Sequence, residues 1–120
     1  LFNSVMVFFV QEGFDSHYGF WTGGLLYSSH MRTSVTAPLS LGYDFRDNDQ
    51  VAEEAFGEYS AHLFASRTQK IIRTRVEQNK TSPLFLYLAF QSVHSPMEVP
   101  KRYEQPYQHI EVQENVFPSK

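Results

Sequence analysis

The chain has 120 residues, enough for one domain with its own core, and 42% hydrophobic with 19% charged residues is the composition of a globular protein. Its net charge of −3 argues against a nucleic-acid partner, which requires a basic protein face. The absence of cysteine excludes disulfides, thiolate metal sites and a cysteine nucleophile from these residues.

The first third of the chain predicts little regular structure. The apolar run Val5–Val10 is far too short for a membrane span and lacks signal-peptide features, so it indicates a strand or the remnant of a truncation. Closely spaced glycines and aromatic residues predict a shaped loop over Gly13–Gly24, without a phosphate-binding glycine pattern. We expect a short strand at Leu25–Met31 and irregular structure over Arg32–Leu41.

The acidic segment Gly42–Gln50 favours a solvated turn that leads into the next helix. Its cluster of acidic and amide residues raises the possibility of a calcium loop of the EF-hand type. That pattern fails from Asp47 onward, because the sixth position, which requires glycine, is Ala52. No metal site is therefore expected in this segment.

An amphipathic helix is predicted from about Glu58 to Gln78. Its apolar or small residues recur at helical spacing; they are Ala61, Phe64, Ala65, Thr68, Ile71, Ile72 and Val76. We expect Ser60 to cap the N-terminus, and Asn79 followed by Pro83 to end the helix.

A strand follows the helix. The run Leu84–Phe90 is apolar at every position and lies between Pro83 and Pro96, a pattern typical of a strand buried on both faces of a parallel sheet. A two-faced helix and a buried strand predict the α/β class. Because ligands bind beyond the carboxyl ends of parallel strands, His94 lies where such a protein keeps its chemistry.

Together these residues resemble the middle of a sulfatase catalytic domain, of the arylsulfatase B type and its relatives arylsulfatases I and J. The resemblance is carried by Gly13–Gly23, Tyr43–Asp47, Glu58–Phe64, and above all Pro83-Leu-Phe-Leu-Tyr-Leu-Ala-Phe-Gln-Ser-Val-His-Ser-Pro96, which continues through Val99–Tyr103 and Pro106-Tyr107. It covers most of the chain, and the block that ends in His94 is its most specific part.

The resemblance implies part of an alkaline-phosphatase-like α/β domain that hydrolyses sulfate esters, with sulfated hexosamines of glycosaminoglycans or aryl sulfates as substrates. Enzymes of this kind use a bound Ca²⁺ and a formylglycine made from cysteine. His94 is then the residue that binds the sulfate group of the substrate. The resemblance also implies a lysosomal or secreted protein, and this gives weight to the glycosylation sequon at Asn79.

Several family features have no counterpart here. The Cys-x-Pro-x-Arg motif that supplies the formylglycine is missing, and so are the acidic residues that hold the calcium. We expect residues 13–112 to be a partial sulfatase catalytic domain, with residues 1–12 and 113–120 unmatched. The chain is expected to be an internal piece of a sulfatase, such as an incomplete gene model would give, and to be inactive by itself.

Other interpretations stay open. A non-catalytic fragment that acts only by binding would retain the helix and strand without the chemistry, and a phosphatase or phosphodiesterase would keep the superfamily and change the ester. His17 and His30 are expected to pack in the core rather than to bind zinc. No serine near His94 lies on a nucleophile elbow, so no catalytic triad is predicted. The isolated chain is expected to be poorly soluble or partly unfolded, because the apolar strand would lack neighbours.

Overall fold

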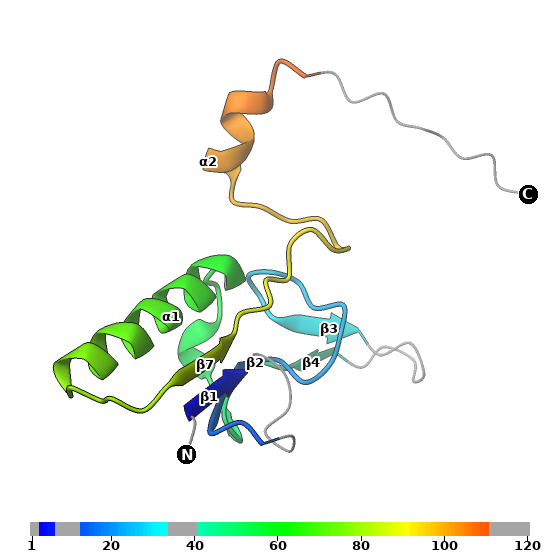
Figure 1. The fold of residues 1–120 in the computed structure, drawn as a ribbon. Helices are drawn as coiled ribbons and strands as arrows, with labels where there is room; N and C mark the ends of the chain where they lie inside the picture. The colour runs from blue at the N-terminus through cyan, green and yellow to red at the C-terminus, as the bar shows by residue number, and fades with distance from the viewer. Residues whose placement is uncertain (1–2, 7–12, 34–40, 111–120) are drawn as a thin grey trace, which may run out of the picture.

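The structure, a computed structural model of the chain, describes residues 3–6, 13–33 and 41–110. A five-stranded mixed sheet forms its base, in the order β6-β5-β2-β1-β7 (Figure 1). Its strands are β1 (Asn3–Met6), β2 (Ser16–Gly19), β5 (Arg46–Asp47), β6 (Gln50–Val51) and β7 (Leu84–Tyr87). Strand β1 pairs in parallel with β2 and β7, whereas β5 runs antiparallel to β2. The carboxyl ends of three strands therefore lie at one edge of the sheet.

Strand β1 overlaps the predicted Val5–Val10 run only at its start, and the remainder of that run lies outside the described residues. Strand β2 lies inside the segment Gly13–Gly24, which was expected to be a loop, so that expectation is wrong for its central residues. The strand forms there because β1 and β5 supply ladder partners on both sides. Its formation depends on these distant residues, and the local glycine content does not show it.

The predicted strand Leu25–Met31 is also wrong. Residues 27–29 form a turn, and the strand β3 (Met31–Thr33) begins only at the last residue of the segment. The Tyr27 N–H donates to the Glu98 carboxylate at 2.6 Å and its carbonyl accepts from the Ser60 N–H at 2.8 Å, so neither group is left for a ladder. His30 adopts a φ of 53°, which breaks the extended backbone.

The segment Arg32–Leu41 was expected to be irregular, but both of its ends contribute to a second sheet. Strand β3 pairs antiparallel with β4 (Leu41–Tyr43), and residues 34–40 lie outside the described residues. The acidic segment that follows contains a turn at residues 48 and 49, as predicted, but the turn joins the strands β5 and β6. Asn48, with a φ of 56°, accepts from the His17 N–H at 3.0 Å and thereby ties this hairpin to β2.

The predicted helix is confirmed as α1 (Ser60–Glu77), which is preceded by the short 3₁₀ helix η2 (Glu53–Ala55). Phe64 from its predicted apolar stripe is buried, but Ile72 and Val76 are exposed. The N-cap is Tyr59, not Ser60 as expected. The Ser60 hydroxyl instead donates to the Gln91 side chain at 3.0 Å, because Gln91 lies beside the first turn of the helix.

The core lies between α1 and the sheet. Its buried members are Tyr18, Phe20, Leu25, Phe45, Ala52, Ala55 and Phe64. The rings of Phe45 and Phe64 stack at 5.8 Å between centroids, and Arg67 of α1 donates to Asp47 of β5 at 2.8 Å. Apolar packing and one ion pair therefore fix the helix to the sheet.

Strand β7 begins where the sequence predicts but is shorter, and it is not buried on both faces as expected. Burial alternates along it, with Phe85 and Tyr87 about half exposed, because only one face meets α1 and β7 is the last strand of the described sheet. Beyond β7 the chain reaches the short helices α2 (Lys101–Glu104) and η3 (Gln105–Tyr107), which stand away from the sheet in Figure 1. Within the described part of the chain, no helix is long and apolar enough to cross a membrane.

Candidate functional site

The loop that carries His94 follows the carboxyl end of β7. Its path is held by the phenol oxygen of Tyr27, which lies more than sixty residues earlier in the sequence. That oxygen accepts from the His94 N–H at 3.0 Å, and its proton faces the carbonyl oxygens of His94 at 2.7 Å and Gln91 at 3.1 Å. The backbone of His94 is therefore held through both its N–H and its carbonyl group.

The Gln91 side chain makes a second connection within this loop. Its amide nitrogen donates to the carbonyl of Leu25, and its amide oxygen accepts from the Ser60 hydroxyl. Leu25 and Ser60 are both fully or almost fully buried. The start of the loop after β7 is thus joined to the core and to the first turn of α1.

The imidazole of His94 is exposed, and its Nδ1 lies 2.6 Å from the carbonyl oxygen of Ser95. A carbonyl oxygen only accepts, so Nδ1 carries a proton and donates. Within the described part of the chain, Nε2 has no hydrogen-bond partner. In the imidazolium form Nε2 also carries a proton, and His94 then presents a positively charged donor that suits an anion such as sulfate.

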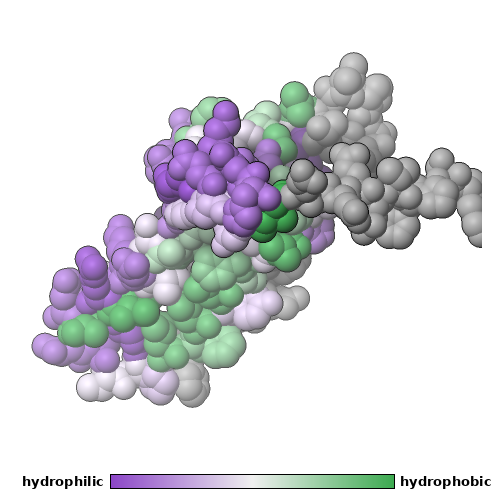
Figure 2. Space-filling view, turned by 90° about the horizontal axis from the view of Figure 1, so that it is seen from above, coloured by the Kyte–Doolittle hydropathy of each residue, from purple (hydrophilic) through white to green (hydrophobic). Residues whose placement is uncertain are grey.

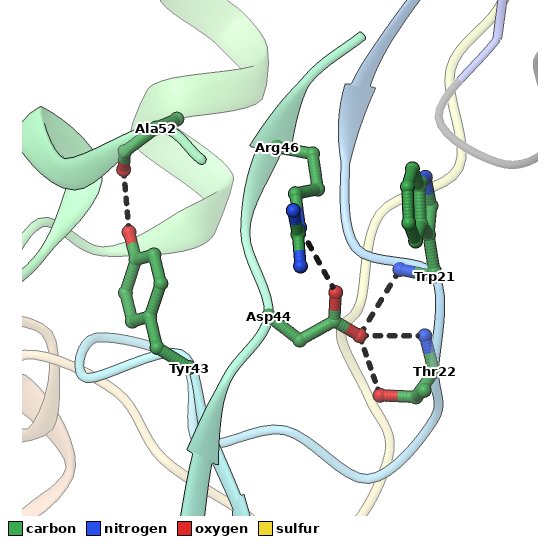
Figure 3. A network of polar contacts seen from close by, with 6 residues as sticks. All are labelled: Trp21, Thr22, Tyr43, Asp44, Arg46 and Ala52. Atoms are coloured by element: carbon green, nitrogen blue, oxygen red, sulfur yellow. Dashed lines mark hydrogen bonds and ion pairs between the residues drawn. The ribbon is translucent and has the colours of Figure 1, made fainter. Parts of the chain in front are cut away.

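A second ordered loop follows β2 at the same edge of the sheet. The carboxylate of Asp44 accepts from the N–H groups of Trp21 at 3.2 Å and Thr22 at 2.8 Å, and from the Thr22 hydroxyl (Figure 3). Its other oxygen lies 3.8 Å from Arg46, whose guanidinium lies over the Trp21 ring. Asp44 is therefore an acceptor that orders this loop.

Tyr43 precedes Asp44 in the chain. Burial raises the pKa of Tyr43 to about 12, so its hydroxyl stays neutral and donates to the Ala52 carbonyl.

An open polar hollow of about 530 Å³ is lined by residues that contact Tyr27. Its lining includes Tyr59, which stacks on the Tyr27 ring, and Glu98, which accepts from the Tyr27 N–H. His62 also faces it and lies 2.8 Å from the Tyr103 hydroxyl. The hollow provides polar surface next to the loop of His94.

The remaining sequence-predicted site residues lie apart from this loop. His17 and His30 are fully buried, as expected for packed histidines. Among residues 3–6, 13–33 and 41–110, no three side chains of the His, Asp and Glu types are grouped so that they could hold a metal ion. A Ca²⁺ site therefore does not fit the donors that the described residues bring together. Asn79 is exposed just beyond α1, where its side chain is accessible.

Tyr27 and Gln91 were not identified as functional residues from the sequence. Gln91 belongs to the block that ends in His94, so its position was visible although its contacts were not. Tyr27 was not singled out, because its partners beyond β7 lie 64 to 71 residues away in the chain. Only the folded structure brings them together.

Comparison with known proteins identifies the family. A sequence model described as Sulfatase matches residues 2–115. Over 101 residues the chain is 38% identical to mouse (Mus musculus) arylsulfatase J. The aligned region covers 83% of this chain but only 16% of that relative's length. The mixture of helices with a sheet of parallel and antiparallel strands agrees with the α/β class expected for such a domain. The chain belongs to the sulfatase family.

Proposed function

We propose that this chain is the sulfate-binding segment of a sulfuric ester hydrolase of the arylsulfatase type, and that His94 contacts the sulfate group. The observation that carries the proposal is the exposed imidazole of His94, with one nitrogen bonded to Ser95 and the other without a partner among the described residues. An imidazolium offsets the negative charge of a sulfate ester by a charge-assisted hydrogen bond. The family match supports the reaction class.

The substrates proposed are sulfate esters, with sulfated hexosamines of glycosaminoglycans as the finer assignment and aryl sulfates as its simple analogues. Chemistry beyond binding requires groups that these 120 residues do not contain. The sequence has no cysteine from which a formylglycine could be made. The His, Asp and Glu side chains of the described residues are not grouped so that they could hold Ca²⁺. The contribution of this segment is therefore to bind and orient the sulfate.

A binding measurement tests this role. Equilibrium dialysis against radiolabelled inorganic sulfate should show binding to the chain, and His94→Ala should weaken it about tenfold, the loss expected for one charged hydrogen bond. His109→Ala is the matched control, because His109 is also exposed but lies in the turn after η3. Equal binding by the His94→Ala variant would refute the assignment. Turnover of an aryl sulfate by the chain alone is expected to be undetectable.

A second candidate function is binding without catalysis, either to a sulfated glycan or to a full-length homologue. The retained α1–β7 unit, together with the absence of a cysteine that could supply the nucleophile, motivates this alternative. A phosphatase is disfavoured by the block Gln91–Pro96, which resembles that of sulfatases. It would be supported if the segment bound chondroitin sulfate more tightly than inorganic sulfate. A lysosomal or secreted location is part of the main proposal, and glycosylation of exposed Asn79 on secretion from mammalian cells would support it.

A further inference from the structure

We infer that the hydroxyl of Tyr27 is the positioning group for His94, an inference that rests on the proposed sulfate-binding role of that histidine. A single oxygen atom contacts both backbone polar groups of His94, at 3.0 Å to its nitrogen and 2.7 Å to its carbonyl oxygen. Contacts on both sides of one residue limit its rotation in a way that a single contact would not. The contacts of the Tyr27 hydroxyl are with backbone atoms of the loop, so its role is exerted through His94.

Tyr27 can hold the loop because Tyr27 is itself fixed. Its side chain is buried, with 2% exposed, and its ring stacks on Tyr59 with centroids 5.9 Å apart. Its backbone donates to Glu98 at 2.6 Å and accepts from the N–H of Ser60, the first residue of α1, at 2.8 Å. Tyr27 therefore connects the backbone of His94 to the first residue of helix α1.

The loop has few other means of holding His94 in place. The side chain of His94 is exposed and that of the neighbouring Val93 is 85% exposed, so apolar packing does not restrain this part of the chain. An anion-binding donor loses affinity when it must be ordered at the moment of binding. Loss of the Tyr27 hydroxyl should therefore weaken sulfate binding even though the imidazole is untouched.

The test is the variant Tyr27→Phe in the full 120-residue chain, which removes one oxygen and keeps the ring and its stacking. Tyr43→Phe is the matched control, because it also removes a hydroxyl that donates to a backbone carbonyl, that of Ala52 at 2.6 Å, which lies outside the loop of His94. Two readouts are needed. One is hydrogen exchange of the His94 amide, measured by mass spectrometry on fragments of residues 91–97. The other is the affinity for radiolabelled inorganic sulfate.

We expect Tyr27→Phe to accelerate exchange of the His94 amide and to weaken sulfate binding, each about tenfold, as for the loss of one or two hydrogen bonds. In Tyr43→Phe both quantities should stay near those of the parent chain. Unchanged exchange in Tyr27→Phe would overturn the inference. The inference would also be overturned if the parent chain binds sulfate through His94 and Tyr27→Phe binds it equally tightly. In that case the proposed function would survive.

If the parent chain does not bind sulfate, the proposed function fails, and the exchange measurement alone decides whether Tyr27 positions the loop. If Tyr27→Phe does not fold, the parent chain decides instead. A His94 amide that exchanges there as fast as in an unfolded peptide would overturn the inference, whereas slow exchange would support it.

Discussion

His30 lies in an aromatic part of the core, with its ring centroid 4.4 Å from that of Phe45 and 6.0 Å from that of Tyr43. Its Nε2 lies 2.9 Å from the carbonyl oxygen of Ala55 and donates to it. Burial, the largest effect, lowers the pKa of His30 from its ordinary value, while backbone contacts with Ala55 and Glu58 oppose this in part. The neutral ring is thus the form that the folded chain accommodates.

A dependence of stability on pH follows. Because the pKa of His30 is lower in the folded chain than in the unfolded chain, the unfolded chain takes up the proton first as the pH falls. The free energy of unfolding should therefore be at its full value above about pH 6.5 and should decrease below it, by at most about 1.4 kcal/mol per pH unit from this group. Urea unfolding between pH 5 and 8 measures the effect.

The variant His30→Asn isolates this contribution, since asparagine tolerates the φ of 53° at this position. We expect the variant to be less stable near neutral pH but to show a flatter dependence on pH. His109→Asn, at an exposed site, should leave the dependence unchanged. The same dependence in His30→Asn as in the parent chain would show that another group causes it.

At the scale of elements, α1 determines where the sheet edge and its loops lie. Phe64 is the buried centre of its packing, stacked on Phe45 and in edge-to-face contact with Phe90 at 6.4 Å. Phe90 belongs to the segment between β7 and His94, so Phe64 connects the helix with the start of the site loop. The contacts of Ser60 with Gln91 and Tyr27 add polar connections at the same end of the helix.

The substitution Phe64→Ala should lower the free energy of unfolding by about 3–5 kcal/mol, because it leaves a cavity where two rings lost their partner. That is a large share of the stability of a typical small domain. Val76→Ala, in the same helix but 71% exposed, should change it by less than about 0.5 kcal/mol. Urea unfolding monitored by circular dichroism compares the two, and a loss below about 1 kcal/mol for Phe64→Ala would contradict the packing described.

The sequence predicts those elements that have a local pattern and misses those that depend on distant residues. Helix α1 was predictable because its burial follows a local period of 3.6 residues, and β7 was recognisable as an apolar run between prolines. Strand β2 was not, because its pairing with β1 and β5 is what makes Ser16–Gly19 extended. The location of His94 after β7 was predictable, whereas its restraint by Tyr27 depends on a contact across 67 residues. Nonlocal hydrogen bonds leave no periodic signal.

At the scale of the whole molecule, apolar side chains are exposed along one continuous stretch of the chain from β7 onward. Those with large exposed fractions are Phe85, Tyr87, Phe90, Val93, Met97 and Val99. Hydrophobic surface is also contiguous in the space-filling view of Figure 2, beside a hydrophilic area. Strand β7 ends the described sheet, so its outer backbone groups are also without a strand partner there. An edge strand with exposed apolar side chains favours association between chains.

We therefore expect the chain to self-associate at micromolar concentration, with β7 as a contact. Tyr87→Lys places a charge on this edge and should increase the monomer fraction in sedimentation velocity, since a lysine on an edge strand opposes strand-to-strand pairing. Val76→Lys is the matched control, because it adds the same charge at an exposed apolar site on α1 and should have a smaller effect. A parent chain that sediments as a monomer and unfolds in one sharp transition would contradict the expectation. An equal effect of both substitutions would assign the association to net charge, because only a response specific to Tyr87→Lys identifies the edge of the sheet as the contact.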